Sequence, residues 1–246
     1  MAVPNIIRIP ILPLGMVNCH VIQGPSGCVL VDAGLPGSEG KIERGLKKRG
    51  LSFDDIKLIV ITHAHVDHAG AAAALRAATG APIVAHEADA KHYRREAPMS
   101  YCSTGWVGDY LLRRKIILRP YVGFEPDILL SNDASLDLSP YGISGQVVPT
   151  IGHTAGSISV KLDTQDALVG DLVSSGILMG GIIRTGNAKR PPFEDDPRAV
   201  GIELQRLVDS GVRRFYLGHG GPLEASEVQR HAQQLMEVQP GASAVA

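Results

Sequence analysis

Residues 62–70 read Thr-His-Ala-His-Val-Asp-His-Ala-Gly, which places three histidines and one aspartate within six positions. The preceding run, residues 56–61, is apolar and rich in β-branched side chains, as is typical of a buried strand. Residues 69–79 are rich in alanine and end before Gly80, which predicts a helix. The cluster therefore connects a strand to a helix, where a rigid strand end can direct several side chains at one point.

The residue types in this cluster indicate a metal site. Imidazole nitrogen and carboxylate oxygen are ligands of Zn²⁺, Fe and Mn. One histidine on a loop is usually solvated or hydrogen-bonded, and two close together often arise by chance. No local structure needs four such side chains in six positions, so we predict that they hold a metal: His63, His65, Asp67 and His68.

The spacing His-x-His-x-Asp-His resembles the signature of the metallo-β-lactamase superfamily, and the resemblance extends from about Pro13 to His219. Three later residues match, in order, the positions that complete the sites of this family: His153, Asp171 and His219. Glycine flanks each of them and allows the backbone to turn tightly beside a metal. The resemblance implies two ions, one held by His63, His65 and His153, the other by Asp67, His68 and His219, with Asp171 bridging them.

Hydrolysis is the chemistry that this ligand set implies. Two divalent ions roughly 3.5–4 Å apart share a hydroxide, lower the pKa of the parent water and polarise a substrate carbonyl. Asp67 is the expected catalytic residue, because its carboxylate can orient the hydroxide and pass a proton to the leaving group. Asp32, in the segment Cys-Val-Leu-Val-Asp-Ala-Gly, is expected to support a ligating histidine. The alternative for Asp32 is an ordinary turn before Gly34.

The resemblance implies an α/β fold, a four-layer αββα sandwich with the metals at one edge. Apolar runs bounded by turn residues agree with this and predict two groups of strands, over 6–31, 56–61 and 82–85, and over 146–148, 157–162, 167–169 and 213–217. Helices are expected over 38–49, 198–210 and 224–237. We expect a single domain over residues 1–238 and a flexible tail over 239–246.

Residues 91–137 are the least regular part of the chain and a possible lid insertion over the metals. They hold more than half of the chain's aromatic side chains: Tyr93, Tyr101, Trp106, Tyr110, Tyr121 and Phe124. The alternative is a helical excursion that only packs on the sandwich, because aromatic side chains are common in ordinary cores. A second wall of the site is expected in residues 174–192, where glycines follow Asp171.

Among metal hydrolases, the resemblance favours the glyoxalase II and lactonase-like branch, which cleaves thioesters or lactones. Only 27 residues follow His219, too few for the helical segment with which glyoxalase II binds glutathione. Ser174 stands where lactone hydrolases of the family carry a tyrosine, and Asp171 argues against β-lactam hydrolysis. The open alternatives are an iron-dependent oxygenase of the persulfide type and a non-catalytic binding module. Two Zn²⁺ ions are the expected cofactors, with Fe or Mn also compatible with this ligand set.

Composition excludes other classes of function. The formal net charge of −1 offers no electrostatic footprint for nucleic acid, and no run approaches the roughly 18 apolar residues of a spanning helix. Cys19, Cys28 and Cys102 are odd in number and widely spaced, which predicts free thiols. We therefore expect a cytoplasmic enzyme with a small-molecule substrate and without nucleic-acid or membrane partners; the oligomeric state is left open. The remaining histidines are expected to be structural: His20, His86, His92 and His231.

Overall fold

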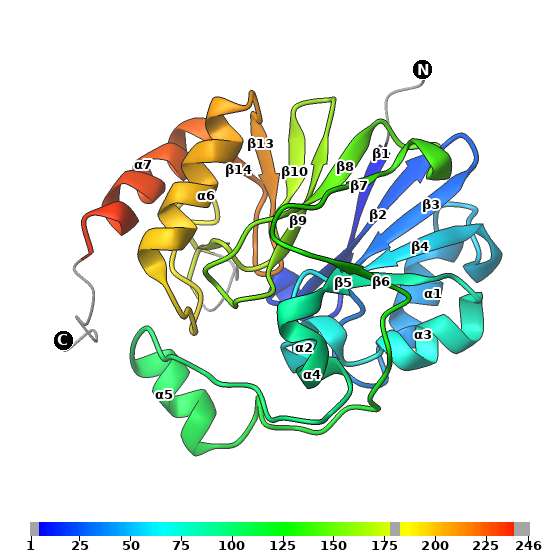
Figure 1. Ribbon diagram of the computed structural model, residues 1–246, viewed down its shortest axis with the longest axis horizontal. Coiled ribbons are helices and arrows are strands. Elements are labelled where there is room, and N and C mark those ends of the chain that lie inside the picture. Colours follow the sequence, from blue (N-terminus) through cyan, green and yellow to red (C-terminus); the bar gives the residue numbers. More distant parts are fainter. Residues whose placement is uncertain (1–4, 178–182, 239–246) are drawn as a thin grey trace.

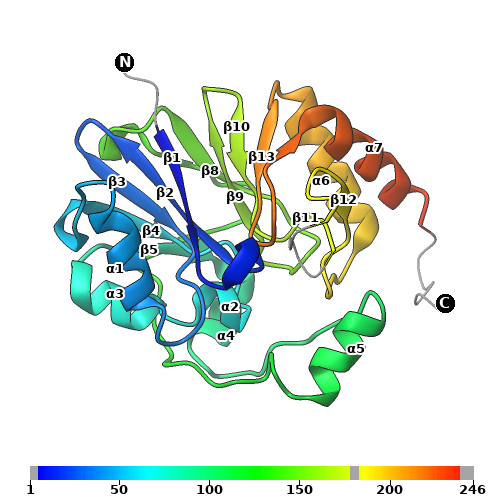
Figure 2. The ribbon, with the colours of Figure 1, turned by 180° about the vertical axis from the view of Figure 1, so that it is seen from behind.

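The computed structural model describes residues 5–177 and 183–238, and its centre is formed by two six-stranded sheets (Figures 1 and 2). The first sheet has the order β1-β2-β3-β4-β5-β6. Its strands β1 to β3 are antiparallel, and β3 to β6 run parallel. The bounds are β1 (Asn5–Pro10), β2 (Asn18–Gly24), β3 (Gly27–Val31), β4 (Ile56–Val60), β5 (Ile83–His86) and β6 (Ile128–Leu130).

The second sheet has the order β14-β13-β10-β9-β8-β7. Because β8 and β10 are each antiparallel to β9, and β13 is parallel to β10, the strands β8, β10 and β13 all run in one direction. The bounds are β7 (Leu136–Asp137), β8 (Gly145–Pro149), β9 (Ile158–Leu162), β10 (Asp166–Leu168), β13 (Arg214–Tyr216) and β14 (Leu223–Glu224). A separate two-stranded sheet pairs β11 (Ser174–Ser175) with β12 (Ala188–Lys189).

Helices cover the outer face of each large sheet, which completes the expected αββα sandwich (Figures 1 and 2). α1 (Glu39–Lys47) and α3 (Ala72–Thr79) cover the first sheet, and α6 (Pro197–Asp209) and α7 (Ala225–Met236) cover the second. The short helices α2 (Val66–Ala69) and α4 (Ala90–Tyr93) lie near the edge of the first sheet, and α5 (Trp106–Arg113) stands apart from the four layers.

Strand β4 illustrates why the central strands are apolar without alternation. Successive side chains of a strand point to opposite faces of the sheet. Leu58 and Val60 pack between the two sheets, whereas Ile59 and Ile61 pack beneath the helices. Both faces of the strand are therefore buried, so both sets of positions must be apolar.

The direction of the strands fixes where the candidate residues gather. The carboxyl ends of β3 and β4 lie at one edge of the first sheet, since these strands are parallel neighbours. In the second sheet, the shared direction of β8, β10 and β13 likewise brings the residues after these strands to one edge. Residues that are distant in the sequence are thus brought to a single rim of the sandwich.

Two sequence expectations are corrected. The helix expected over 69–79 is two helices, α2 and α3, which separate at Gly70. A methyl group at Gly70 would collide with Pro36 and with the Val66 carbonyl, so this close packing requires a residue without a side chain. The helix expected over 38–49 is shorter, because α1 spans only Glu39–Lys47.

The possible lid over 91–137 does not form one kind of structure. Its last part contributes β6 to the first sheet and β7 to the second, and Tyr121 and Phe124 are buried in the core of the first sheet. The part that lies outside the sandwich is the stretch around α5 (Figure 1). That the segment acts as a lid stays a prediction. The tail expected over 239–246 lies outside the described residues, as does part of the wall expected over 174–192.

Candidate metal centre

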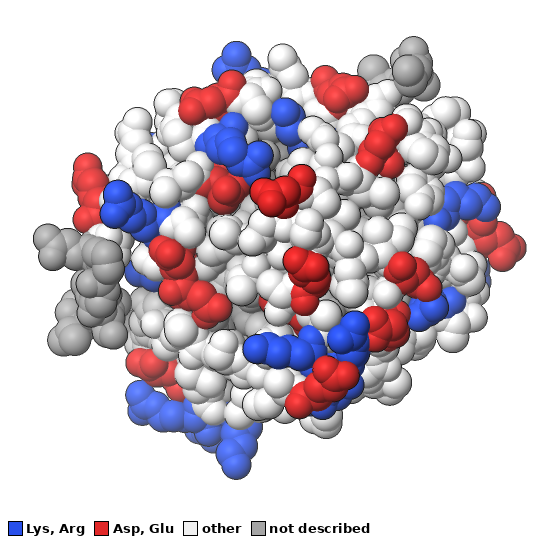
Figure 3. Space-filling view, in the orientation of Figure 1, with Lys and Arg blue, Asp and Glu red and all other residues white. Residues whose placement is uncertain are grey.

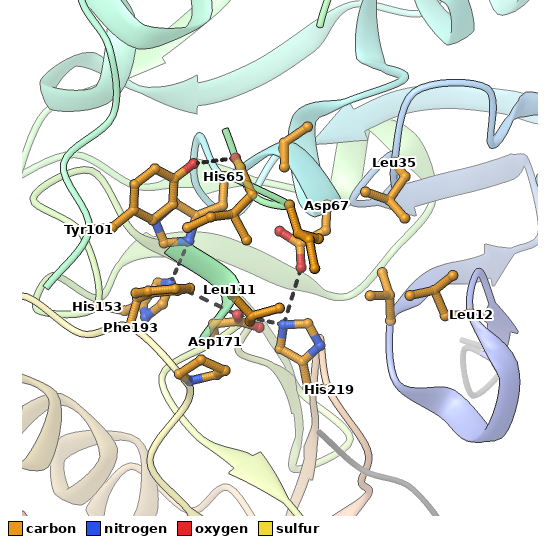
Figure 4. A pocket seen from close by; sticks show the side chains of 15 residues that line it. Leu12, Leu35, His65, Asp67, Tyr101, Leu111, His153, Asp171, Phe193 and His219 are labelled. Carbon is orange, nitrogen blue, oxygen red and sulfur yellow. Dashed lines mark hydrogen bonds and ion pairs between the residues drawn. The ribbon is translucent and has the colours of Figure 1, made fainter. Parts of the chain in front are cut away.

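The seven candidate ligands converge at the rim of the sandwich, and Figure 4 shows His65, Asp67, His153, Asp171 and His219 among them. They come from the segments after four strands and from the first turn of α2: His63 and His65 after β4, Asp67 and His68 on α2, His153 after β8, Asp171 after β10 and His219 after β13. All are buried except Asp67, whose side chain is 21% exposed.

A first group consists of His63, His65 and His153. Nε2 of His63 lies 3.0 Å from Nδ1 of His65 and 3.1 Å from Nε2 of His153, and the last two nitrogens are 3.2 Å apart. Ligand nitrogens on a tetrahedral Zn²⁺ lie about 3.4 Å apart, from Zn–N distances of about 2.1 Å. Three nitrogens in a buried triangle of this size fit a single ion.

Burial also keeps this first group in the form that binds metal. It lowers the pKa of His65 and of His153 to about 3. Burial, followed by the neighbouring His68, lowers the pKa of His63 well below its ordinary value. Neutral imidazoles offer lone pairs, so these three rings are ready to act as ligands at neutral pH.

A second group consists of Asp67, His68 and His219, and Asp171 lies between the two groups. Oδ2 of Asp67 is 3.4 Å from Nε2 of His219 and 3.9 Å from Nε2 of His68. Oδ1 of Asp171 lies 3.3 Å from Nε2 of His68, and its Oδ2 lies 2.9 Å from Nε2 of His219 and 3.9 Å from Nε2 of His153. The Asp171 carboxylate thus contacts the second group with both oxygens and faces the first.

The negative charge of the carboxylates in and beside the second group favours binding of a cation there. Burial lowers the pKa of His219, but Asp171 outweighs it and raises this pKa to about 9; for His68 the same opposition leaves the pKa well above its ordinary value. Burial would raise the pKa of Asp171, yet the two histidines hold it well below. Nε2 of His68 and Oδ1 of Asp171 are buried without a hydrogen-bond partner in the described chain. A buried imidazole nitrogen and a buried carboxylate oxygen without hydrogen-bond partners are ligand atoms that fit a divalent ion.

Asp32, expected from the sequence to support a ligating histidine, contacts His68 of the second group. Its Oδ2 lies 2.8 Å from Nδ1 of His68, which turns Nε2 of that ring toward Asp171. Its Oδ1 accepts hydrogen bonds from the backbone and hydroxyl groups of Thr62. Asp32 adopts a left-handed backbone conformation with φ of 64°, which these contacts stabilise.

Asp89 joins the two halves of the site, and sequence reasoning missed it. Its Oδ2 accepts hydrogen bonds from Ala64 N at 3.1 Å and from Thr154 Oγ1 at 3.0 Å, and its Oδ1 accepts from Gly156 N at 3.0 Å. One buried carboxylate therefore ties the loop of His63 and His65 to the loop of His153. The one available signal is its place shortly after β5, the parallel neighbour of β4.

The N-terminal part of the chain positions His219. Nδ1 of His219 hydrogen-bonds to the Met16 carbonyl. Asn18 is fully buried, and its Nδ2 donates to the carbonyl groups of Leu217 at 3.3 Å and Gly220 at 3.2 Å. These two contacts of Asn18 are not visible in the sequence, because Leu217 and Gly220 lie 199 and 202 residues away.

Five of the seven candidate ligands form the floor of a cavity of about 600 Å³, including its open mouth: His65, Asp67, His153, Asp171 and His219. Tyr101 and Leu111, from the segment 91–137, line it, and Phe193 closes it on the side of His153 (Figure 4). Ser174 does not line it; its hydroxyl donates to the Lys189 and Arg190 carbonyls. The four histidines expected to be structural belong to none of the metal-ligating groups in residues 5–177 and 183–238.

Comparison with known proteins agrees with this geometry. The chain matches the family model of the metallo-beta-lactamase superfamily over residues 12–219. It belongs to this superfamily. This match confirms the expected family and fold, and at this level the chain is a metal-dependent hydrolase.

Relatives in two bacteria and one archaeon illustrate the match. The chain is 31% identical to "Probable metallo-hydrolase YqgX" of Bacillus subtilis over 72% of its own length and 74% of that protein. It is 26% identical to "Probable metallo-hydrolase MJ0888" of Methanocaldococcus jannaschii, covering 82% and 87%. The solved metallo-beta-lactamase family protein TTHA1429 of Thermus thermophilus has a TM-score of 0.65 and 25% identity, covering 95% of this chain and 78% of that one.

Proposed function

We propose that this protein hydrolyses an ester-like bond, with thioesters and lactones favoured, using two divalent metal ions. The observation that carries the proposal is the pair of ligand groups, His63/His65/His153 and Asp67/His68/His219, with Asp171 between them. The alternative, an iron-dependent persulfide oxygenase, needs a single ion bound by part of the same ligand set. The second ligand group supports hydrolysis, and the number of bound ions distinguishes the two functions.

Two ions bound there would activate a water molecule and polarise the substrate carbonyl. In the overall reaction, hydroxide forms a bond to the acyl carbon, the bond to the sulfur or oxygen of the leaving group breaks, and the leaving group takes up a proton. Asp67 is proposed to deliver that proton, since it is the one candidate ligand whose carboxylate is partly open to the cavity. Zn²⁺ is the proposed metal, although the same nitrogen and oxygen donors accept Fe and Mn.

Surface and sequence features support a small-molecule substrate in a reducing compartment. Lys and Arg are mixed with Asp and Glu on the face seen in Figure 3, without a basic patch of the kind that binds nucleic acid. No helix in the described ranges combines the length and the apolar character needed to cross a membrane. Cys19, Cys28 and Cys102 are free thiols, which supports the proposed cytoplasmic location.

The test combines metal analysis with a substrate screen. We expect two metal ions per chain by elemental analysis and turnover of thioesters or lactones, but not of phosphodiesters or β-lactams. Asp67→Asn should retain the fold and lose most of the turnover, because an amide cannot deliver a proton. One iron per chain, together with oxygen consumption on a persulfide, would overturn the proposal.

A further inference from the structure

The cavity above the candidate ligands is apolar on its sides. Apart from the ligands themselves, its lining consists of aliphatic side chains, one proline and two aromatic rings. Leu12 and Leu35 lie on one side of the ligands, and Tyr101 and Phe193 lie on the other (Figure 4). The polar floor is thus flanked by two walls that cannot form hydrogen bonds with a substrate.

The aliphatic wall is assembled from segments that are far apart in the sequence. Leu12 precedes a short turn after β1, and Leu35 follows β3. Leu111, on α5, and Ile117, just beyond it, line the same cavity from the segment outside the sandwich. All four side chains are only partly buried, so they retain apolar surface that a ligand can cover.

The lining also lacks a group that would recognise a charged substrate. Among the described residues that line the cavity, none is lysine or arginine. The Tyr101 hydroxyl already donates to the Ile117 carbonyl at 3.0 Å, and the Tyr101 ring stacks on His65 at 4.8 Å between centroids. Tyr101 therefore presents its ring, and not its hydroxyl, to the cavity. A carboxylate or phosphate in the substrate would find no partner away from the metals.

We propose that the cavity binds an uncharged aliphatic acyl group, so that the substrate is a neutral acyl thioester or an alkyl-substituted lactone. The chain of the acyl group lies against Leu12, Leu35, Leu111 and Ile117 while its carbonyl carbon lies above the candidate ligands. This inference rests on the proposed hydrolase function and names the part of the substrate that gives specificity.

The first test uses the metal-loaded enzyme and two substrate series that differ only in chain length. These are acyl thioesters of N-acetylcysteamine, from acetyl to decanoyl, and γ-lactones with alkyl substituents of increasing length. Each methylene that leaves water contributes up to about fourfold to kcat/KM. We therefore expect kcat/KM to rise by at least about tenfold from acetyl to hexanoyl and to level off where the chain leaves the cavity.

A charged analogue provides the matched comparison in the wild-type enzyme. Butyryl and succinyl thioesters have the same number of chain carbons, but the second ends in a carboxylate. We expect the succinyl thioester to be cleaved at least about tenfold more slowly, because its carboxylate is desolvated without a partner. A succinyl thioester that is cleaved as well as the butyryl one would overturn the inference.

Two leucine variants in one segment test the wall itself. Leu111→Asn should lower kcat/KM for the hexanoyl thioester more than for the acetyl thioester, and so flatten the dependence of kcat/KM on chain length. Leu118→Asn is the control, since Leu118 is 48% exposed and does not line the cavity. Cleavage without any dependence on chain length would overturn this inference alone. If the enzyme cleaves neither the thioesters nor the lactones, the proposed function is overturned, and the inference with it.

Discussion

Oδ2 of Asp32 accepts a hydrogen bond from Nδ1 of His68 over 2.8 Å, and this contact directs the opposite nitrogen of the ring at Asp171. A carboxylate that fixes the orientation of a ligating histidine also sets its tautomer and raises its basicity. The contact is buried on both sides, so water cannot replace it when the carboxylate is removed. Asp32 is therefore expected to act on metal affinity through His68.

Asp32→Ala should weaken the binding of the second ion by about 10–100-fold and leave the first ion nearly unchanged. His68 belongs to the second group, whereas His63, His65 and His153 keep their own contacts. Competition with a chromophoric chelator measures the two affinities. Asp163→Ala, at an exposed position, is the control. An equal loss at both ions would show that Asp32 supports the site as a whole.

Asp171→Ala should lower the occupancy of both ions. Its oxygens contact His68 and His219, and one of them also faces His153, so both groups lose a ligand when the carboxylate is removed. Elemental analysis after dialysis measures the metal content per chain. Loss of a single ion would contradict the bridging role.

Asp89→Asn should lower both the stability of the protein and its affinity for the first ion. The carboxylate accepts three hydrogen bonds, from Ala64, Thr154 and Gly156, and an amide group must turn its NH₂ toward at least one of these donors. One unsatisfied buried donor costs about 1–3 kcal/mol. Urea unfolding measures the loss of stability, with Asp163→Asn as the control. Unchanged unfolding would mean that the two loops hold their positions without Asp89.

Gly218→Ala should abolish metal binding with little effect on folding. A methyl group there would collide with Oδ1 of Asp171 and with the His68 ring, and both of these are fixed by burial. Gly186→Ala is the matched control, because the position of its added methyl group is open. Metal content and the far-ultraviolet circular dichroism spectrum distinguish loss of the site from loss of the fold. Full metal occupancy in Gly218→Ala would contradict the packing described for the second group.

Glu194 is expected to make stability depend on pH. Burial raises its pKa from 4.5 to about 7 even though Arg190 contacts its Oε2. Its Oε1 is buried without a hydrogen-bond partner in the described chain. A raised carboxyl pKa favours folding below pH 4.5, and this contribution is lost as the pH rises through about 7. Relative to Glu194→Gln, the wild-type protein should lose on the order of 3 kcal/mol of unfolding free energy between these values. Parallel pH dependence of the two proteins in urea unfolding would contradict the assignment.

The segment 62–70 shows what the sequence by itself determined. The spacing of its ligands and the apolar run over 56–61 that precedes it are local properties of the sequence. The strand, the loop after it and the identity of these four ligands could therefore be predicted from the sequence. Resemblance to the family supplied His153, Asp171 and His219 in order. Without it, each is only a histidine or an aspartate beside glycine, which is typical of ordinary turns.

Tertiary structure decided the rest, because the remaining features depend on contacts between distant residues. Pro36 packs so closely against Gly70 that no side chain fits there, and Asp89 joins two loops of different sheets. The aliphatic wall exists only because the edge of the sandwich brings Leu12 and Leu35 to the same cavity as Leu111. Local sequence carries the period of a strand and the spacing of a motif, whereas the packing of two sheets determines which strand ends, and therefore which side chains, meet.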